Sequence, residues 1–113
     1  MAQAVFAHEG AAIDYTPGAD VSAGDVIVQG DLVGVARLDI KAGVLGALAV
    51  TGVFDFPKAT GVGTAIAAGV EVYWDVADAE AKTDSETGAN KLIGKTVAAA
   101  GDNDATVRVR MSQ

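Results

Sequence analysis

Hydrophobic residues recur at every second position in several short stretches of the chain, and this period limits the fold more than any other feature. In residues 47–58 the large apolar side chains, including Phe54 and Phe56, fall on one side. Successive side chains of a strand point to opposite faces, so the stretch predicts one strand packed on a core. Pro57 cannot donate a ladder hydrogen bond and is expected to end it. Gly52 interrupts the apolar row, which indicates a bulge, a bend or the close approach of another strand.

The same alternation predicts further strands, separated by turn residues. Residues 32–40 are expected to place Leu38 on the core face, residues 70–75 to point Trp74 inward, and the last strand to occupy residues 105–111. No segment shows an apolar stripe with the 3.6-residue period of a helix. The pattern therefore predicts an all-β fold, either a small β-barrel or a β-sandwich.

The length of 113 residues suits one domain, and we expect residues 1–113 to form a single unit. Residues 1–9 precede the first clear turn signal and are expected to form an N-terminal arm. Residues 76–90 are polar and lack a helical stripe, so they are predicted to be an insertion or hairpin between two strands.

Short matches suggest that the chain consists of two similar halves. Ala23-Gly24 and Ala68-Gly69 each precede a strand, and Leu32-Val33-Gly34 resembles Leu92-Ile93-Gly94. The first pair is 45 positions apart and the second is 60 apart, a difference that the insertion at 76–90 would absorb. The alternative is that Ala-Gly turns recur by chance in a chain with 14 glycines.

The residues needed for common kinds of catalysis and metal binding are missing from the sequence. There is no cysteine, which excludes disulfides and thiolate metal sites. His8 is the only histidine and lies in the predicted arm, so neither a His-based zinc site nor a Ser-His-Asp triad is expected. Residues 88–96 resemble a phosphate-binding P-loop, but five residues instead of four separate Gly88 from Gly94, and the segment has strand character. We therefore expect no enzyme activity and no cofactor.

Charge and hydropathy exclude two further classes of partner. The net charge is −7, whereas proteins that bind nucleic acid usually carry a basic patch. No stretch approaches the roughly 20 apolar residues of a membrane helix.

Arg108 and Arg110 share one face of the last predicted strand. That face is either solvated or contacts an acidic partner or a neighbouring subunit.

Seven short segments, in this order and spacing, make the chain resemble a family of phage capsid cement, or decoration, proteins over nearly its whole length. No single segment is diagnostic. They are Ile13-Asp14-Tyr15-Thr16-Pro17, Ala23-Gly24-Asp25-Val26, Leu32-Val33-Gly34-Val35-Ala36, Gly52-Val53-Phe54-Asp55-Phe56-Pro57-Lys58, Gly69-Val70-Glu71-Val72-Tyr73-Trp74-Asp75, Leu92-Ile93-Gly94 and Ala105-Thr106-Val107-Arg108-Val109-Arg110.

The resemblance implies a structural protein of the virion that acts on no small-molecule substrate. Such proteins bind the outer surface of the phage head in many copies, often as trimers, and their partner is the major capsid protein. The family provides no motif for the contact residues. We hypothesise that the arm contacts the shell, by adding a strand to a capsid edge. The expected contact residues are Ala2, Gln3, Ala4, Val5, Phe6, Ala7 and His8.

An alternative function is a β-barrel module on the virion that recognises a host-surface ligand such as carbohydrate. Sugar sites usually expose aromatic rings, and Trp74, Tyr73 and Tyr15 are the candidates besides the phenylalanines. Burial of Trp74 would count against this alternative.

Overall fold

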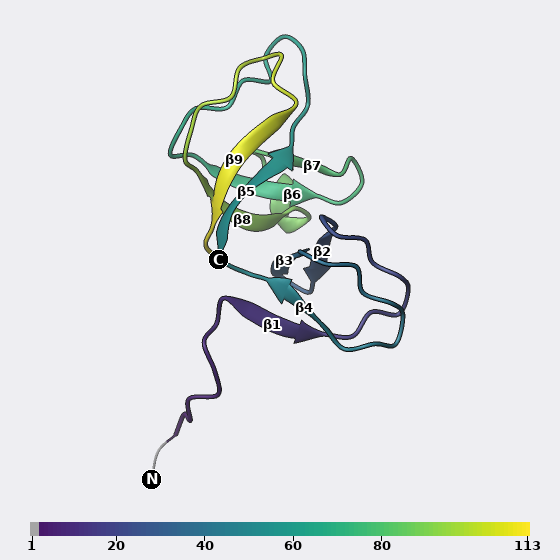
Figure 1. Ribbon diagram of the computed structural model, residues 1–113. Coiled ribbons are helices and arrows are strands. Elements are labelled where there is room, and N and C mark those ends of the chain that lie inside the picture. Colours follow the sequence, from purple (N-terminus) through teal and green to yellow (C-terminus); the bar gives the residue numbers. More distant parts are fainter. Residues whose placement is uncertain (1–2) are drawn as a thin grey trace.

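The chain folds into two antiparallel β-sheets (Figure 1). The computed structural model describes residues 3–113, in which the only helical segment is a short 3-10 turn, η1 (Glu86–Gly88). The sheets have four and five strands and do not close into a barrel, so the prediction of an all-β fold is confirmed and the sandwich is the alternative that fits. The strands are β1 (Ala12–Tyr15), β2 (Val26–Gln29), β3 (Leu32–Ala36), β4 (Gly46–Ala49), β5 (Gly52–Pro57), β6 (Glu71–Asp75), β7 (Glu80–Lys82), β8 (Lys91–Thr96) and β9 (Thr106–Met111).

Residues 47–58 form two strands, so the prediction of one continuous strand is wrong. β4 belongs to the four-stranded sheet and β5 to the five-stranded sheet. Gly52 has φ 114°, and a Cβ there would meet the Phe54 ring at 3.3 Å, so glycine permits the bend that carries the chain between sheets. The alternation continues through the bend because Leu48 and Phe56, each 1% exposed, both face cores. Pro57 ends β5 as predicted.

β3 ends at Ala36, and the prediction that Leu38 faces the core is wrong, because its side chain is 76% exposed. The alternation is misleading here because β3 is buried on both faces. Val33 faces the larger core and Ala36 the smaller one, and neither is exposed. A strand buried on both faces carries small and apolar residues at successive positions, so its period does not identify a single inner face.

The two sheets have the same strand arrangement, which confirms the prediction of two similar halves. The four-stranded sheet has the order β1-β4-β3-β2, and the five-stranded sheet has the order β5-β9-β8-β6 with β7 added at the edge. Figure 1 shows the first half below and the second half above. The additional strand β7 and the turn η1 both lie in residues 76–90, where the sequence comparison requires an insertion.

Backbone hydrogen bonds repeat at equivalent positions of the two halves. The amide of Gly24 donates to the carbonyl of Ala36 at 2.6 Å, and the amide of Gly69 donates to the carbonyl of Thr96 at 2.9 Å. Isolated bridges likewise join Val21 to Ile40 in the first half and Ile66 to Ala100 in the second. Val21 and Gly24 lie 45 positions from their equivalents Ile66 and Gly69, and Ala36 and Ile40 lie 60 positions from their equivalents Thr96 and Ala100. These are the spacings of the sequence matches.

The smaller apolar cluster lies within the first half, whereas the larger one combines residues of the second half with Val33 and Val35 of β3, and the halves meet through the equivalent strands β3 and β8. Leu48 in β4 and Val109 in β9 are buried at equivalent positions. β3 packs against β8, where Val33 and Ile93 are equivalent and both fully buried. Trp74 is 6% exposed and its ring centroid lies 6.0 Å from that of Phe56. Trp74 is therefore a core residue, as expected.

The side chain of Gln113 joins the end of the second half to the first. Its Nε2 donates to the carbonyl of Val33 at 2.6 Å, and the amide of Val33 donates to its Oε1 at 2.6 Å. The adjacent Ser112 amide donates to the carbonyl of Ile93 at 3.0 Å. The glutamine amide thus satisfies backbone groups of β3 that would otherwise lie unpaired between the sheets.

We expect Gly94→Ala to destabilise the protein more than Gly34→Ala, although the two glycines are equivalent. A Cβ on Gly94 would lie 2.0 Å from the carbonyl oxygen of Arg110, a backbone atom of the neighbouring strand. A Cβ on Gly34 would lie 2.9 Å from the Leu48 Cβ and 3.1 Å from its Cδ1, so the overlap is smaller and involves only side-chain atoms. Urea denaturation should show losses of about 3 and about 1 kcal/mol respectively. Gly18→Ala, with no atom within 4 Å, is the control, and equal losses at positions 94 and 34 would contradict the argument.

We expect Gln113→Ala to lower the free energy of unfolding by about 1 kcal/mol, since it leaves the amide and carbonyl of Val33 unpaired. The same denaturation experiment tests this, with Ser112→Ala as the control, because Ser112 contributes only its backbone amide. An unchanged midpoint for Gln113→Ala would show that the amide pair does not stabilise the contact between the halves.

Candidate interaction surface

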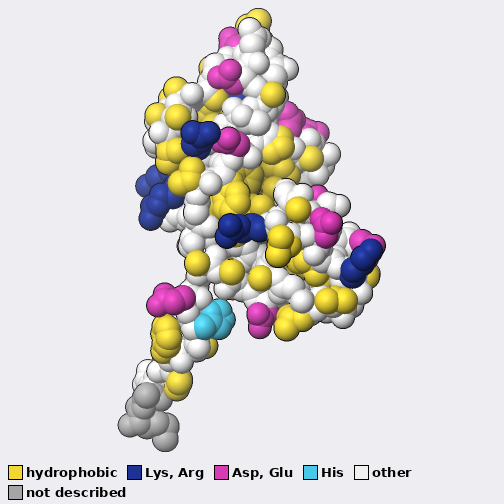
Figure 2. Space-filling model, viewed as in Figure 1, with side chains coloured by type: hydrophobic (Ala, Val, Ile, Leu, Met, Phe, Trp, Pro, Cys, Tyr) yellow, Lys and Arg dark blue, Asp and Glu magenta, His cyan; other side chains and the backbone are white. Residues whose placement is uncertain are grey.

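The arm lies outside both sheets and exposes apolar side chains. Residues 3–8 form no strand, and Val5 and Phe6 are 84% and 78% exposed. Figure 1 shows the arm running away from the body before β1 begins, and Figure 2 shows hydrophobic side chains along it. His8 makes a hydrogen bond through Nδ1 to the adjacent Glu9 carbonyl at 2.6 Å. Of the predicted contact residues, Ala2 lies outside the described residues, and Gln3 to His8 are all exposed.

Arg108 and Arg110 are exposed on one face of β9, but they have different neighbours. Arg108 lies opposite Asp55 and binds it with two contacts, Nε to Oδ1 at 2.9 Å and Nη2 to Oδ2 at 3.2 Å. Arg110 lies between Val53 of β5 and Lys95 of β8 and forms no ion pair within residues 3–113. Like charges on directly opposed strand positions repel each other. Lys95 and Arg110 therefore form a small basic site that an acidic partner would stabilise.

The ion pair between Asp55 and Arg108 shifts the protonation of both groups. The hydrogen bonds from Arg108 hold the pKa of the Asp55 carboxyl below its ordinary value, 3.8; desolvation opposes this shift, and the charge of Arg108 adds to it. The same contacts raise the pKa of Arg108. Because both side chains are about half exposed, solvent screens the pair and its contribution to stability is small.

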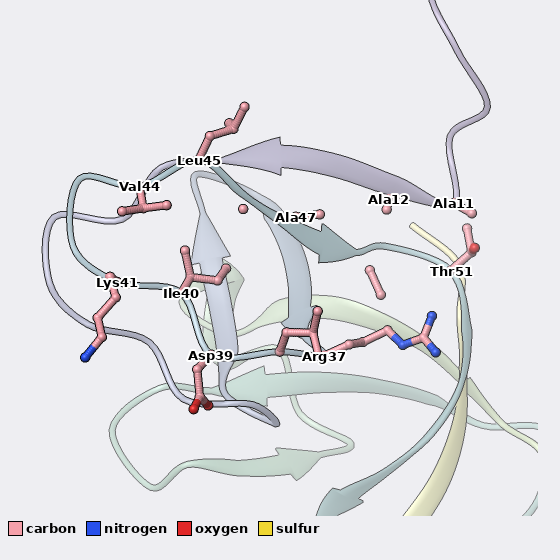
Figure 3. A pocket seen from close by; sticks show the side chains of 13 residues that line it. Ala11, Ala12, Arg37, Asp39, Ile40, Lys41, Val44, Leu45, Ala47 and Thr51 are labelled. Carbon is pink, nitrogen blue, oxygen red and sulfur yellow. The ribbon is translucent and has the colours of Figure 1, made fainter.

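A groove that the sequence analysis did not predict lies beside β1 and β4. Its volume is about 670 Å³, and its walls are largely apolar. Ala47 and Ala49 line it from one face of β4, while Leu48 points to the core on the opposite face. Leu38 and Leu45 stand at its rim, 76% and 66% exposed. In Figure 3 Ala47 of β4 and Ala12 of β1 lie above the segment 37–41, with Val44 and Leu45 to their left.

The groove is built from three segments that are distant in the chain. Ala11 and Ala12 come from the start of β1, residues 37–41 follow β3, and residues 44–51 contain β4. The only sequence signal is that apolar Leu38 and Val44-Leu45 occur in turn segments. Figure 2 shows exposed hydrophobic side chains over this half of the molecule.

Arg37 and Lys41 place positive charge at the groove. Both side chains are exposed and belong to the segment that lines it. In Figure 3 the guanidinium of Arg37 points toward the Thr51 end, whereas Lys41 points away from the groove. Asp39 between them accepts the backbone amide of Ala23 at 2.8 Å. Arg37 forms no ion pair with any residue that the structure describes.

A buried lysine, Lys58, joins two loops of the second half. It is 5% exposed, and its Nζ donates to the carbonyls of Ala59 at 2.7 Å and Asp104 at 3.2 Å and to Thr64 Oγ1 at 3.3 Å. The ammonium has three oxygen partners within the fold, so Lys58 is a structural cross-link.

The remaining motifs have structural explanations. Gly94 lies inside β8, which does not provide the strand-to-helix turn of a P-loop. Residues 101–104 form a turn in which the amide of Gly101 donates to Asp104 Oδ2 at 2.8 Å. Within residues 3–113, no cluster of three His, Cys, Asp or Glu side chains could hold a metal ion, and no helix is long and apolar enough to cross a membrane.

We expect NMR titration to give a pKa below 3.8 for the Asp55 carboxyl and a value closer to 3.8 in the Arg108→Ala variant. The folded-state pKa is depressed, so the pair stabilises the protein above the unfolded pKa and loses this contribution as pH falls through the folded one. Arg110→Ala is the matched control and should leave the Asp55 titration nearly unchanged. An unshifted pKa in the wild type would show that the ion pair does not form in solution.

Comparison with known proteins identifies the family. A family model described as phage cement protein matches residues 7–111. Searches of the curated proteins and of the solved structures found no match. The match includes both halves of the sandwich and the groove, and it indicates a structural role associated with the phage capsid. The chain therefore belongs to the phage cement protein family.

Proposed function

We propose that this protein binds the outer surface of a phage head, contacts the major capsid protein and stabilises the mature shell without catalysing a reaction. The observation that carries the proposal is the match to the cement family along residues 7–111. The surface supports it, because the molecule offers an exposed apolar arm and a small basic site. We further propose that the protein acts as a homotrimer.

The proposed mechanism is linkage between binding and stability. A protein that binds the mature shell but not its dissociated or immature forms lowers the free energy of the mature shell alone. Many copies, each with a modest contact area, act together because the shell holds their sites in fixed positions. Closed symmetry allows one interface to build the whole trimer.

Two parts of the surface are proposed as contacts. The arm, from Ala2 to His8, would bind the shell, because Val5 and Phe6 offer apolar area that the body leaves uncovered. The basic face of β9 would meet an acidic partner or a neighbouring subunit. Asp55 already binds Arg108, so Arg110 together with Lys95 should contribute more to that contact.

The burial of Trp74 weighs against the carbohydrate-binding alternative. Its ring packs on Phe56 and is 6% exposed, which leaves little surface for stacking on a sugar. Tyr15 and Tyr73 are each only partly exposed.

Binding to shells that lack the protein tests the proposal. Purified mature shells should bind wild-type protein in near-stoichiometric ratio to the capsid protein, counted by quantitative mass spectrometry, and should then withstand higher temperature before releasing DNA. Deletion of residues 2–8 should raise the dissociation constant for shells at least about tenfold, the loss expected if one anchor side chain contributes 1.4 kcal/mol or more.

Val62→Ser is the control for this experiment, because Val62 is a fully exposed valine in the loop after β5. It should bind shells like the wild type. Wild-type protein that fails to bind would overturn the proposed function, whereas normal binding after deletion of residues 2–8 would overturn the role of the arm alone.

A further inference from the structure

The two halves permit an internal comparison that shows which surface residues the fold requires. Ala49 pairs with Val35 in the first half as Arg110 pairs with Lys95 in the second. By the same register Ala47 is equivalent to Arg108, which lies opposite Asp55. At the exposed position of this register the second half thus carries Arg108 where the first half carries Ala47, whereas Ala49 is buried beside Val35 of the larger core.

The fold therefore does not require the groove beside β4 to be small and apolar. An arginine at the position equivalent to Ala47 is compatible with the same strand pairing in the other half. Nor does the core require Leu38, Val44 or Leu45, because 53–76% of each is exposed. An exposed apolar surface that the fold does not need points to a binding partner.

The N-terminal arm has chemical properties that complement those of the groove. Val5 and Phe6 are large, apolar and 84% and 78% exposed. Glu9 follows them and forms no ion pair within residues 3–113, and Arg37 beside the groove forms none either. A groove with apolar walls and a free guanidinium thus matches a segment with two apolar side chains and a free carboxylate.

We propose that the groove beside β1 and β4 binds the arm of a second copy of the chain, with Val5 and Phe6 against Ala47 and Leu45 and with Glu9 near Arg37. The arm of the same copy is poorly placed to do this. Its attachment, Ala11 and Ala12, lines the groove, and the arm leaves the body from there (Figures 1 and 3). To enter its own groove the chain would have to reverse direction within residues 7–10, whereas a neighbour's arm can enter directly.

This contact is heterologous, since an arm on one copy meets a different surface on the next, and repeating it around an axis closes a ring. It deepens the proposed function by identifying the interface of the proposed homotrimer, and it can be tested without the shell. In this arrangement the neighbouring copy covers Val5 and Phe6 in place of the direct shell contact proposed above, so these two side chains would promote shell binding by holding the copies together.

Mixing two complementary variants tests the inference by sedimentation velocity. Ala47→Arg blocks the groove but keeps the arm, and deletion of residues 2–8 removes the arm but keeps the groove. The wild type should sediment as a closed oligomer and each variant alone as a monomer. An equimolar mixture should form a dimer, because one intact arm can enter one intact groove.

Val62→Arg is the matched control, because it adds the same charge at an exposed valine in the second half and should leave the wild-type oligomer intact. Leu45→Asp provides a second groove variant in case Ala47→Arg does not fold, and circular dichroism verifies the fold of each.

Each other outcome overturns the inference. An Ala47→Arg protein that stays oligomeric shows that the groove is not the interface. An arm-deleted protein that stays oligomeric shows that the arm does not hold the copies together. Two monomeric variants that do not form a dimer show that the arm binds its own groove or that the groove serves the shell protein. A monomeric wild type that still binds shells overturns the inference and leaves the proposed function intact.

Discussion

The contact between β3 and β8 determines most of the structure. These strands occupy equivalent positions in the two halves, and Val33 and Ile93 bury their side chains completely where the halves meet. Burial of one such side chain contributes about 1.5–3 kcal/mol relative to exposure, so the contact strongly favours the stacked arrangement. Each of these strands also carries a glycine at an equivalent position, where it packs against β4 or β9 of its own sheet. Gly34 and Gly94 both lie where a neighbouring strand approaches too closely for a Cβ to fit without adjustment.

Because the two halves share one architecture, a comparison of equivalent positions distinguishes the residues that the fold requires from those that it does not require. Inner positions keep the same character in both halves, as Leu48 and Val109 illustrate, because each half must bury an apolar cluster. Outer positions differ, as Ala47 and Arg108 illustrate, because a solvent-facing strand position tolerates either residue. The polar groups inside the molecule are also satisfied, since no buried side-chain nitrogen or oxygen in residues 3–113 lacks a hydrogen-bond partner.

The sequence predicts the strands, the inward position of Trp74, the end of β5 at Pro57 and the two similar halves, because each of these depends on local period or local turn chemistry. Prediction from the sequence fails where the chain passes between the two sheets and where a strand is buried on both faces. The alternation passes unbroken from Leu48 to Phe56 although Gly52 turns the chain into another sheet, and Leu38 continues a pattern that β3 itself does not use. The pair of Asp55 and Arg108 and the groove depend on strand register, which a single sequence does not determine.

The charge of the chain and its exposed apolar residues can be understood together. A net charge of −7 makes the bodies of neighbouring copies repel one another, which keeps free copies apart in solution. The assembly proposed above then requires localised attraction strong enough to overcome this repulsion. Phe6 on the arm and Leu45 at the groove offer apolar area, while Arg110 with Lys95 offers positive charge that neutralises part of the acidic surface. Salt weakens the general repulsion more than it weakens contacts from which water is excluded, so association driven by the apolar surfaces should strengthen as ionic strength rises.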